Sequence, residues 1–293
     1  MWQCLKKRVK LRLIIHFPTL CHLKKHKKHA KSTRNRRIIY KFASILTESA
    51  KMSNDYFQFK QFTIWHQRCA MKVGTDGVLA GALTPAEGAK HILDVGTGSG
   101  LIALMLAQRC PEAQITAIEI DDDAATQAAE NFAASPWAER IQLIHGDFNE
   151  YTSDILFDLI VSNPPYFTDS LRNPDPHRTQ ARHNETLNYH QLFLRARNLL
   201  QPKGICCVII PTESESFVND MASRHHLFPQ AVTRIYTKPG KPCRRVFITY
   251  WRGKENDLYY PGVKTEQTLY LMDANSQYTP EYRKLTEVFY IKL

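Results

Sequence analysis

Short apolar runs alternate along the chain with longer stretches in which apolar residues recur at helical spacing, beginning near Tyr56. Continuous apolar runs of this kind are typical of buried parallel strands. They predict strands over residues 91–95, 115–120, 141–145, 157–162 and 204–210, and helices over 101–109, 122–134, 190–200 and 213–224. A later run over 245–251 is predicted to be an antiparallel strand at one side of the sheet. Because strands and helices alternate, we expect an α/β fold with a doubly wound, mostly parallel sheet.

The first 51 residues differ sharply from the rest in charge. They contain 15 Lys or Arg and one acid, Glu48, whereas the remainder has 24 basic and 27 acidic residues. The net charges are +14 and −3, so the basicity of the chain belongs to this segment. So basic a segment cannot bury enough apolar surface to fold alone. We therefore expect residues 1–51 to be a disordered tail that precedes a single folded domain over 52–293.

Three interpretations of this tail remain open. The favoured one is that Met52 is the natural start and that residues 1–51 are a mistaken upstream extension of the reading frame. The second is a basic arm that binds RNA phosphates without sequence preference. The third is a transit peptide, against which the abundance of Lys and His and the scarcity of Ser count.

Two classes of protein are disfavoured by composition. No apolar run approaches the roughly 18–20 residues that a bilayer-spanning helix needs. The seven cysteines form no CxxC pair, and Cys206 and Cys207 are neighbours in one strand-like run. We therefore expect reduced thiols in a cytoplasmic protein, with no structural zinc or other metal site.

The strongest short motif is a glycine-rich loop that directly follows the first predicted strand and precedes a helix. Asp94 opens it, and Gly96, Gly98 and Gly100 follow at alternate positions. Glycines allow a sharp turn and a close approach of the backbone to a ligand. A dinucleotide site would require a glycine where Leu101 stands, so the spacing disfavours a pyrophosphate-binding loop. The alternative is a tight turn that binds nothing.

Two further acids follow predicted strands. Glu119 comes at the end of the second strand, where a carboxylate can accept hydrogen bonds from both hydroxyls of a ribose. Asp147 and Phe148 follow the third strand and could bind an adenine amino group and cover its ring. Glu119 could instead be an acid at a helix N-terminus, although residues 121–123 fill that role better. Asp147 could instead cap a helix or a turn.

The sequence Asn163-Pro164-Pro165-Tyr166 stands at the end of the fourth predicted strand. We call it the acceptor motif, because its oxygen atoms can accept hydrogen bonds from an amino group. An exocyclic amino nitrogen is a poor nucleophile because its lone pair is delocalised into the ring. The side-chain oxygen of Asn163 and the carbonyl of Pro164 can accept its N–H groups, and the two prolines stiffen the loop that holds them. Tyr166 can stack on a base extruded from its stack. The alternative is a proline-rich turn that only closes the strand.

Both motifs resemble those of known enzymes. The glycine-rich loop is similar to motif I of class I methyltransferases, which meets the amino-acid end of S-adenosyl-L-methionine. The sequence Asn-Pro-Pro-Tyr is shared by adenine-N6 and cytosine-N4 DNA methyltransferases, by some RNA guanine-N2 enzymes and by the glutamine methyltransferases that act on release factors. The resemblance therefore implies methylation of a planar nitrogen without identifying the polymer.

Three other stretches narrow the resemblance. Residues 59–79, residues 135–141 and the aromatic positions between Tyr278 and Tyr290 resemble the bacterial tRNA(Val) adenine-37 N6-methyltransferases. The match runs from about Phe57 to the end of the chain. It implies a Rossmann-like class I methyltransferase fold with a mostly parallel, doubly wound seven-stranded sheet, S-adenosyl-L-methionine as cofactor and tRNA as substrate.

The resemblance also implies a lid over the cofactor, formed by Lys72, Thr75 and Asp76. The stretch 74–77 reads as a polar turn, although Thr75 or Asp76 could instead cap a helix. Two basic clusters are candidate RNA contacts, with a merely solvated loop as the alternative for each. Their members are Arg172, His177, Arg178, Arg182 and His183 after the acceptor motif, and Lys238, Lys241, Arg244 and Arg245 beside the late strand.

The functional prediction is methyl transfer to N6 of adenine 37 in the anticodon loop of tRNA(Val), by a monomer that needs no protein partner. Other base amino groups in RNA or DNA remain alternatives. A glutamine methyltransferase is a further rival, but the stretch between Met52 and His91 is too short for the factor-binding domain it would need. A non-catalytic RNA-binding module is the rival outside enzymes, and the intact glycine and Asn-Pro-Pro-Tyr motifs argue against it.

Overall fold

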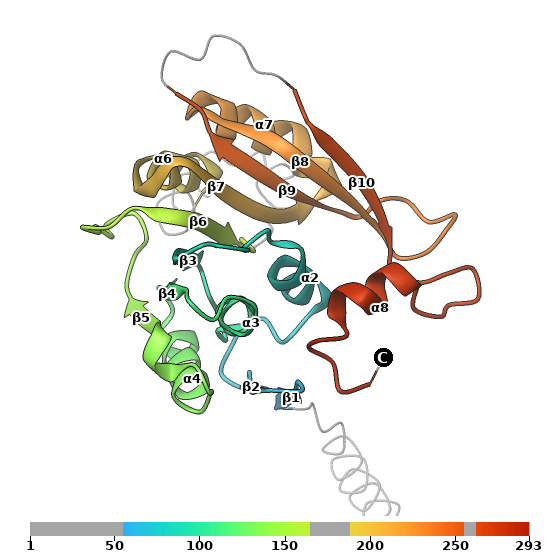
Figure 1. Cartoon of the computed structure of the whole chain (residues 1–293), viewed down its shortest axis with the longest axis horizontal. Helices are drawn as coiled ribbons and strands as arrows, with labels where there is room; N and C mark the ends of the chain where they lie inside the picture. Colours follow the sequence, from blue (N-terminus) through green and yellow to red (C-terminus); the bar gives the residue numbers. More distant parts are fainter. Residues whose placement is uncertain (1–54, 165–187, 255–261, 293) are drawn as a thin grey trace, which may run out of the picture. The chain divides into compact units, whose positions relative to one another are not determined.

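The computed structural model describes residues 55–164, 188–254 and 262–292. A small antiparallel sheet in this part of the chain joins β1 (Tyr56–Gln58) and β2 (Thr63–Trp65), and the main sheet follows it (Figure 1). The predicted tail, residues 1–51, lies outside the described residues.

The main sheet has the strand order β10-β8-β9-β7-β6-β3-β4-β5. Its strands are β3 (His91–Val95), β4 (Gln114–Glu119), β5 (Ile141–His145), β6 (Phe157–Ser162), β7 (Leu200–Pro211), β8 (Leu227–Tyr236), β9 (Arg245–Arg252) and β10 (Thr265–Tyr270). Strands β3 to β7 are parallel, β9 is antiparallel to both of its neighbours, and β10 is parallel to β8. The predicted α/β fold with a mostly parallel sheet is therefore confirmed.

Two details of the predicted sheet are wrong. The main sheet has eight strands within the described ranges rather than seven, and β9 lies between β7 and β8 rather than at one side. The apolar pattern missed β8 and β10. β8 mixes buried and half-buried positions, and β10 exposes all of its residues except Leu269, so neither forms a continuous apolar run.

Helices cover both faces of the main sheet, which is therefore doubly wound (Figure 1). On one face lie α2 (Thr75–Leu83), α3 (Leu101–Arg109), α4 (Asp122–Ala133) and α8 (Pro280–Thr286). On the other lie α6 (Tyr189–Leu199) and α7 (Glu215–Arg224). Two short 3-10 helices, Ala138–Arg140 and Thr212–Ser214, precede β5 and α7. None of the helices in the described ranges has the length and apolar character needed to cross a membrane.

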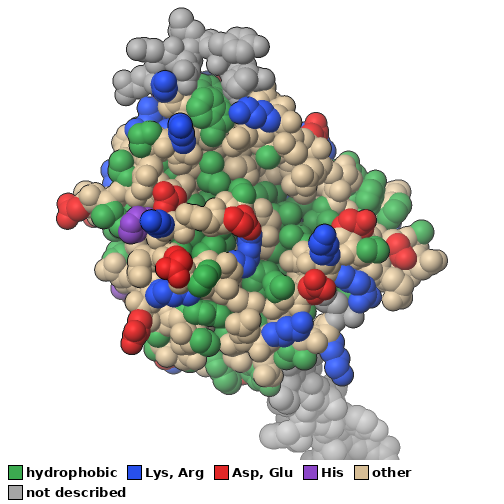
Figure 2. Space-filling view, viewed as in Figure 1, with side chains coloured by type: hydrophobic (Ala, Val, Ile, Leu, Met, Phe, Trp, Pro, Cys, Tyr) green, Lys and Arg blue, Asp and Glu red, His purple; other side chains and the backbone are tan. Residues whose placement is uncertain are grey.

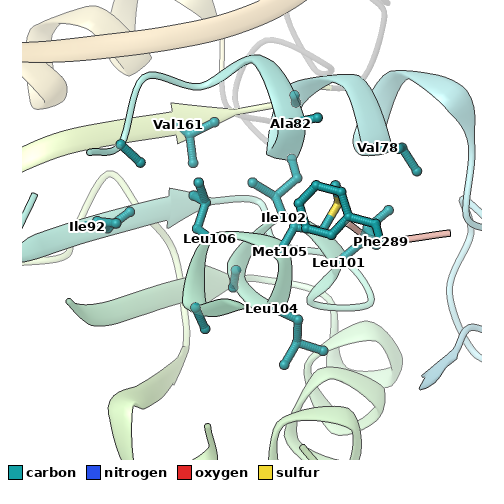
Figure 3. Packing of buried hydrophobic residues seen from close by; sticks show 14 of the residues in the cluster. Val78, Ala82, Ile92, Leu101, Ile102, Leu104, Met105, Leu106, Val161 and Phe289 are labelled. Carbon is teal, nitrogen blue, oxygen red and sulfur yellow. The ribbon is translucent and has the colours of Figure 1, made fainter. Parts of the chain in front are cut away.

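Alternate residues of the central strands face the two helical layers. Ile92 of β3 packs in the cluster with α2 and α3, whereas its neighbour Leu93 packs in the cluster with α6 and α7. Figure 3 shows Phe289, from the end of the chain, in the same hydrophobic cluster as Met105 of α3. Because both faces are covered, the central strands are apolar at consecutive positions, which is why they were readable from the sequence.

The paired cysteines of β7 follow the same alternation. Cys206 and Cys207 are both fully buried, but they belong to the clusters on opposite faces of the sheet. Neighbouring side chains of a strand point in opposite directions, so these two sulfurs are not placed to form a disulfide. Burial raises the pKa of Cys207 to about 12, which keeps the thiol protonated.

Two local differences from the predicted elements have simple causes. β7 begins at Leu200, although the apolar pattern assigned this residue to the helix over 190–200. Leu200 already pairs with Phe157 of β6, and Lys203, whose φ is 70°, interrupts the strand before the apolar run that starts at Gly204. The stretch 74–77 is not a free polar turn, since Thr75 opens α2. Its polar side chains therefore stand on the first turn of a helix.

Candidate active site

The carboxyl ends of β3, β4 and β6 meet at one edge of the main sheet, where the glycine loop (residues 94–100) follows β3. The N–H groups of Gly96 and Thr97 donate to the carbonyl of Ile118 at 2.9 and 3.0 Å, which ties the loop to β4. Gly96 and Gly98 have φ angles of 70° and 58°, and a Cβ on either would meet no atom within 4 Å. Open, left-handed backbone of this kind can approach a ligand closely, so the loop fits a bound cofactor.

Gly100 is required for a different reason. Its φ is 86°, and an added Cβ would lie 2.4 Å from the ring of Phe132 on α4. Only a glycine lets α4 pack this closely against the start of α3. The last glycine of the motif is therefore explained by packing, whereas Gly96 and Gly98 border open space.

Asp94 supports the glycine loop from the protein interior. Its side chain is fully buried, and its Oδ2 accepts from the Thr97 hydroxyl at 2.6 Å and from the Ala103 N–H at 3.1 Å. Its Oδ1 is buried without a hydrogen-bond partner among the described residues. Burial raises the pKa of Asp94 to about 7, although both hydrogen bonds act to lower it. The geometry gives Asp94 a positioning role, because it joins the loop to α3.

Glu119 faces the glycine loop from the end of β4 and is 8% exposed. Its Oε2 accepts from the Gly98 N–H at 2.8 Å, and its Oε1 accepts from the N–H groups of Ile120 and Asp121 at 2.9 and 3.0 Å. Each carboxylate oxygen can accept two bonds, so Oε2 keeps one acceptor position for a ligand. The N-cap of α4 is Asp121, whose Oδ1 accepts from the Ala124 N–H at 2.8 Å.

We use the name lid for residues 66–76, the segment that contains the three predicted lid residues; Asn131 of α4 holds Trp65, the residue directly before it. Asn131 is 1% exposed. Its side chain accepts from the Trp65 N–H at 2.9 Å and donates to the carbonyls of Trp65 and Ser99, both at 2.8 Å. One amide group therefore joins β2, which leads into the lid, to the glycine loop.

The first part of the lid is tied to α4 by an ion pair. Arg68 forms an ion pair with Glu130 of α4 at 2.9 Å. Burial, followed by the negative charges of Glu119 and Asp121, raises the pKa of Cys69 to about 11. Cys69 is thus a neutral thiol that feels the charge of Glu119.

The last part of the lid leads into α2 and is fastened to β9. Asp76 accepts from Arg245 Nε at 2.9 Å, and the two side chains are 25% and 28% exposed. Neither Thr75 nor Asp76 caps α2, because Gly74 holds the N-cap position without a side-chain bond. Lys72 and Thr75 are exposed. The three predicted lid residues therefore lie together at the start of α2.

Asp147 and Phe148 follow β5, and only Phe148 differs from the sequence-based expectation. Asp147 Oδ1 accepts from the Asn149 N–H at 2.8 Å, which closes a turn, as its alternative interpretation predicts. Phe148 is 4% exposed and packs in the core on the α6 side, so its ring offers no free face. Ile120, directly after Glu119, is 56% exposed and presents an apolar side chain at the end of β4.

The acceptor motif begins directly after β6. Ser162 is buried, and its hydroxyl donates to the carbonyl of Val95 at 2.8 Å, which holds the end of β6 against the start of the glycine loop. The Oδ1 atom of Asn163 is buried without a hydrogen-bond partner in the described part of the chain. Pro164, the next residue, is buried. Outside the described residues lie Pro165, Tyr166, Arg172, His177, Arg178, Arg182 and His183.

The second basic cluster lies at the same edge of the sheet, in the turn between β8 and β9. Lys241 and Arg244 are exposed, and Lys238 is half-buried and donates to the Ser276 hydroxyl at 3.3 Å. Arg245 differs from the other three, because it is engaged with the lid through Asp76.

Sequence comparisons identify the family. Residues 71–221, which include the glycine loop, Glu119 and Asn163, match the family model described as "Methyltransferase small domain". A Bacteroides fragilis protein named tRNA1(Val) (adenine(37)-N6)-methyltransferase is 49% identical over 245 residues, which cover 83% of this chain and 100% of that protein. This chain belongs to the tRNA1(Val) (adenine(37)-N6)-methyltransferase family. A family member from Bacteroides thetaiotaomicron is 48% identical over 243 residues, with the same shares covered.

Solved structures agree with the methyltransferase fold. A protein from Agrobacterium tumefaciens, described as a predicted O-methyltransferase, is similar with a TM-score of 0.57 and 19% identity. The similarity covers 73% of this chain and 96% of that chain. At this identity the solved structure supports the fold alone, and the sequence relatives confirm the predicted family.

Sequence reasoning missed three residues of this methyltransferase site, namely Asn131, Cys69 and Ile120. Asn131 carried a readable signal, because it shares the buried face of α4 with Ala124, Ala128 and Phe132. A polar residue on the apolar face of an amphipathic helix needs a partner, and here the partners are backbone groups of the lid and the loop. Cys69 and Ile120 carried no such signal, since neither the position of Cys69 relative to Glu119 nor the exposure of Ile120 can be read from the sequence.

Proposed function

We propose that this methyltransferase transfers a methyl group from S-adenosyl-L-methionine to N6 of adenine 37 in the anticodon loop of tRNA(Val). The relatives that bear this name match the chain over their full length. The structural observation that supports the proposal most directly is the buried Oδ1 of Asn163, which has no hydrogen-bond partner among the described residues. An unpaired buried acceptor costs about 1–3 kcal/mol, and a substrate N–H would remove that cost. We place the whole catalytic domain in residues 52–293 and expect it to act on tRNA as a cytoplasmic monomer.

The methyl donor is S-adenosyl-L-methionine, which supplies an electrophilic methyl group when bound. Gly96 and Gly98 leave open backbone for its close approach. Glu119 keeps one acceptor position on Oε2, which suits a ribose hydroxyl, and Ile120 offers an apolar surface for the adenine ring. Asp147 has a second carboxylate oxygen that can accept from the adenine amino group.

The start of α2 suits the amino-acid end of the cofactor. Its N-cap, Gly74, has no side chain that caps the helix, and a helix N-terminus favours a negatively charged group. Lys72 and Thr75 stand exposed beside this end. A carboxylate placed there would be bound by the helix N-terminus, the hydroxyl and the ammonium group together.

Asn163 and Pro164 act on the acceptor nitrogen. Their side-chain and backbone oxygens accept its two N–H groups, which draws the nitrogen toward a pyramidal geometry and frees its lone pair. The bond from Ser162 to Val95 holds the end of β6, so these acceptors need little reorganisation during the reaction. The nitrogen loses its proton after the methyl group arrives, so no strong base is required. We propose that Tyr166 stacks on the extruded base.

The proposal is tested by replacing Asn163. If its oxygen acts mainly in the transition state, Asn163→Ala should lower the single-turnover rate by about 10²–10³-fold and leave the affinities for cofactor and tRNA nearly unchanged. Asn163→Asp keeps an acceptor in place and should retain part of the activity. Nucleoside mass spectrometry of the tRNA identifies the methylated base.

The matched control is Ser162→Ala, one residue earlier on β6. It removes the bond to Val95, so it should cost about 1 kcal/mol of stability and lower the single-turnover rate far less than Asn163→Ala does. A near-normal single-turnover rate in Asn163→Ala would show that the motif is structural. Methylation at another base would overturn the assignment to adenine 37.

A further inference from the structure

The edge of the sheet that holds the active site continues far beyond β6. The order β6-β7-β9-β8-β10 extends it by four strands. Because β9 is antiparallel, its first residue Arg245 pairs with Pro211 at the end of β7 and with Ile235 near the end of β8. Tyr236 and Tyr270, the last residues of β8 and β10, are paired in register. The ends of all five strands therefore form one continuous edge with the acceptor motif.

The two tyrosines form an aromatic pair on this edge. Their ring centroids are 5.1 Å apart with an angle of 33° between the planes, and Tyr270 is 37% exposed. Ile235 and Leu269, the residues before them, are buried in the cluster on the α2 side. Since neighbouring side chains alternate, the tyrosine pair lies on the opposite face, where α6 and α7 also lie. α6, the first described helix after the acceptor motif, lies on this same face.

Basic side chains adjoin the tyrosine pair. Lys238, Lys241 and Arg244 stand in the turn that follows Tyr236, and no carboxylate among the described residues lies within ion-pair distance of them. Arg245 is paired with an acid of the lid, so it is not counted with them. Figure 2 shows Lys and Arg side chains scattered among acidic and hydrophobic ones over one face of the molecule. Lys238, Lys241 and Arg244 therefore differ from the other basic side chains by their position on the active-site edge of the sheet, and not by forming a separate charged patch.

The spacing of the strands sets the distance from the reaction centre. Strands lie about 4.8 Å apart, so the pair on β8 and β10 is roughly 14–19 Å from the acceptor motif on β6. A base on the tyrosine pair would thus belong to a nucleotide a few positions away from the methylated one. Aromatic rings beside basic side chains are the usual elements of single-strand recognition.

We propose that Tyr236 and Tyr270 stack against an unpaired base of the RNA substrate, while Lys238, Lys241 and Arg244 contact its phosphates. The proposal rests on the proposed function, because it takes the substrate to be an RNA loop. It names a second contact that holds the loop while the target base occupies the active site. The alternative is a tyrosine pair that only stabilises the edge strand β10.

Binding of an RNA anticodon stem-loop, measured by fluorescence anisotropy without methyl transfer, tests this inference. Tyr270→Ala should raise the dissociation constant about 5- to 150-fold, the range found for removing one base-stacking ring. Tyr270→Phe keeps the ring and should bind like the wild type. Stem-loops with one base removed at each loop position then locate the contact. At that position the abasic RNA should weaken binding by the wild type but not by Tyr270→Ala.

Phe228 provides the matched control. It forms an aromatic pair with Trp251 on β8 and β9, with centroids 6.0 Å apart, but at the opposite end of these strands. Phe228→Ala should leave RNA binding unchanged, and thermal unfolding of each variant monitors the fold. Equal losses in Phe228→Ala and Tyr270→Ala, or no loss in Tyr270→Ala, would overturn the inference. Because the assay needs no catalysis, an inactive but RNA-binding protein would refute the proposed function and leave this inference standing.

Discussion

Replacing Glu119 by glutamine is a sharper test of the site than its small change in shape suggests. The carboxylate accepts three backbone N–H groups, from Gly98, Ile120 and Asp121, and uses both oxygens to do so. A glutamine has one oxygen and one NH₂ group, which is a donor. If its oxygen faces Ile120 and Asp121, its NH₂ faces the Gly98 N–H, and the opposite orientation leaves two donors unpaired. Neither orientation satisfies the site.

The magnitude follows from this count of bonds. Hydrogen bonds to charged groups contribute about 1.5–3 kcal/mol each. The better orientation loses the bond from Gly98, so Glu119→Gln should lower the free energy of unfolding by roughly 1.5–3 kcal/mol. In that orientation the NH₂ also stands where Oε2 would accept from the ribose. Loss of that bond should weaken binding of S-adenosyl-L-methionine by a similar amount, or about 10- to 150-fold.

Isothermal titration of the cofactor and chemical denaturation measure the two effects. Asp121→Asn is the control, because it removes the same charge two residues away. Asn caps helices as well as Asp does, so this variant should preserve the cap on α4 and change either quantity by less than about 0.5 kcal/mol. If Glu119→Gln bound the cofactor as tightly as Asp121→Asn, the assignment of Glu119 to the ribose would be wrong.

Two further predictions concern buried polar groups. Asn131→Asp would set a carboxylate oxygen against the carbonyls of Trp65 and Ser99. It should lower both stability and cofactor affinity by about 2 kcal/mol or more in denaturation and titration, whereas the exposed Glu130→Gln should change neither by more than about 0.5 kcal/mol. The pKa of Asp94 is raised from 3.8 to about 7, so the folded protein holds this proton more tightly than the unfolded chain does. The contribution of Asp94 to the free energy of unfolding should therefore fall by up to about 4 kcal/mol as the pH rises from about 4 to about 7. In denaturation experiments at pH 4–8, Asp94→Asn should lack this pH dependence of stability. If the wild type and Asp94→Asn showed the same pH dependence, the burial argument would be contradicted.

The central strands were predictable because their environment is uniform. β3, β5 and β6 have the predicted bounds, and β4 is offset by one residue. β3, β4 and β6 lie inside the sheet with helices on both faces, so each is a nearly continuous apolar run. The glycine spacing and the acceptor motif were equally readable, because both are constraints on consecutive residues. The apolar pattern did not predict the outer strands β8 and β10. β10 is exposed along most of its length, and its place in the sheet depends on pairing with β8 rather than on its own composition.

The sequence by itself determined the fold class, the family and the positions of the chemical groups, because local backbone geometry and consecutive motif residues carry that information. Only the tertiary structure decided how those groups are used. It turned Asp94 and Phe148 inward, set Asn131 between the lid and the glycine loop, and paired Arg245 with Asp76 across 169 positions of the chain. The physical reason is that hydrogen bonds and burial depend on which groups meet in space, and no local pattern specifies contacts between distant segments.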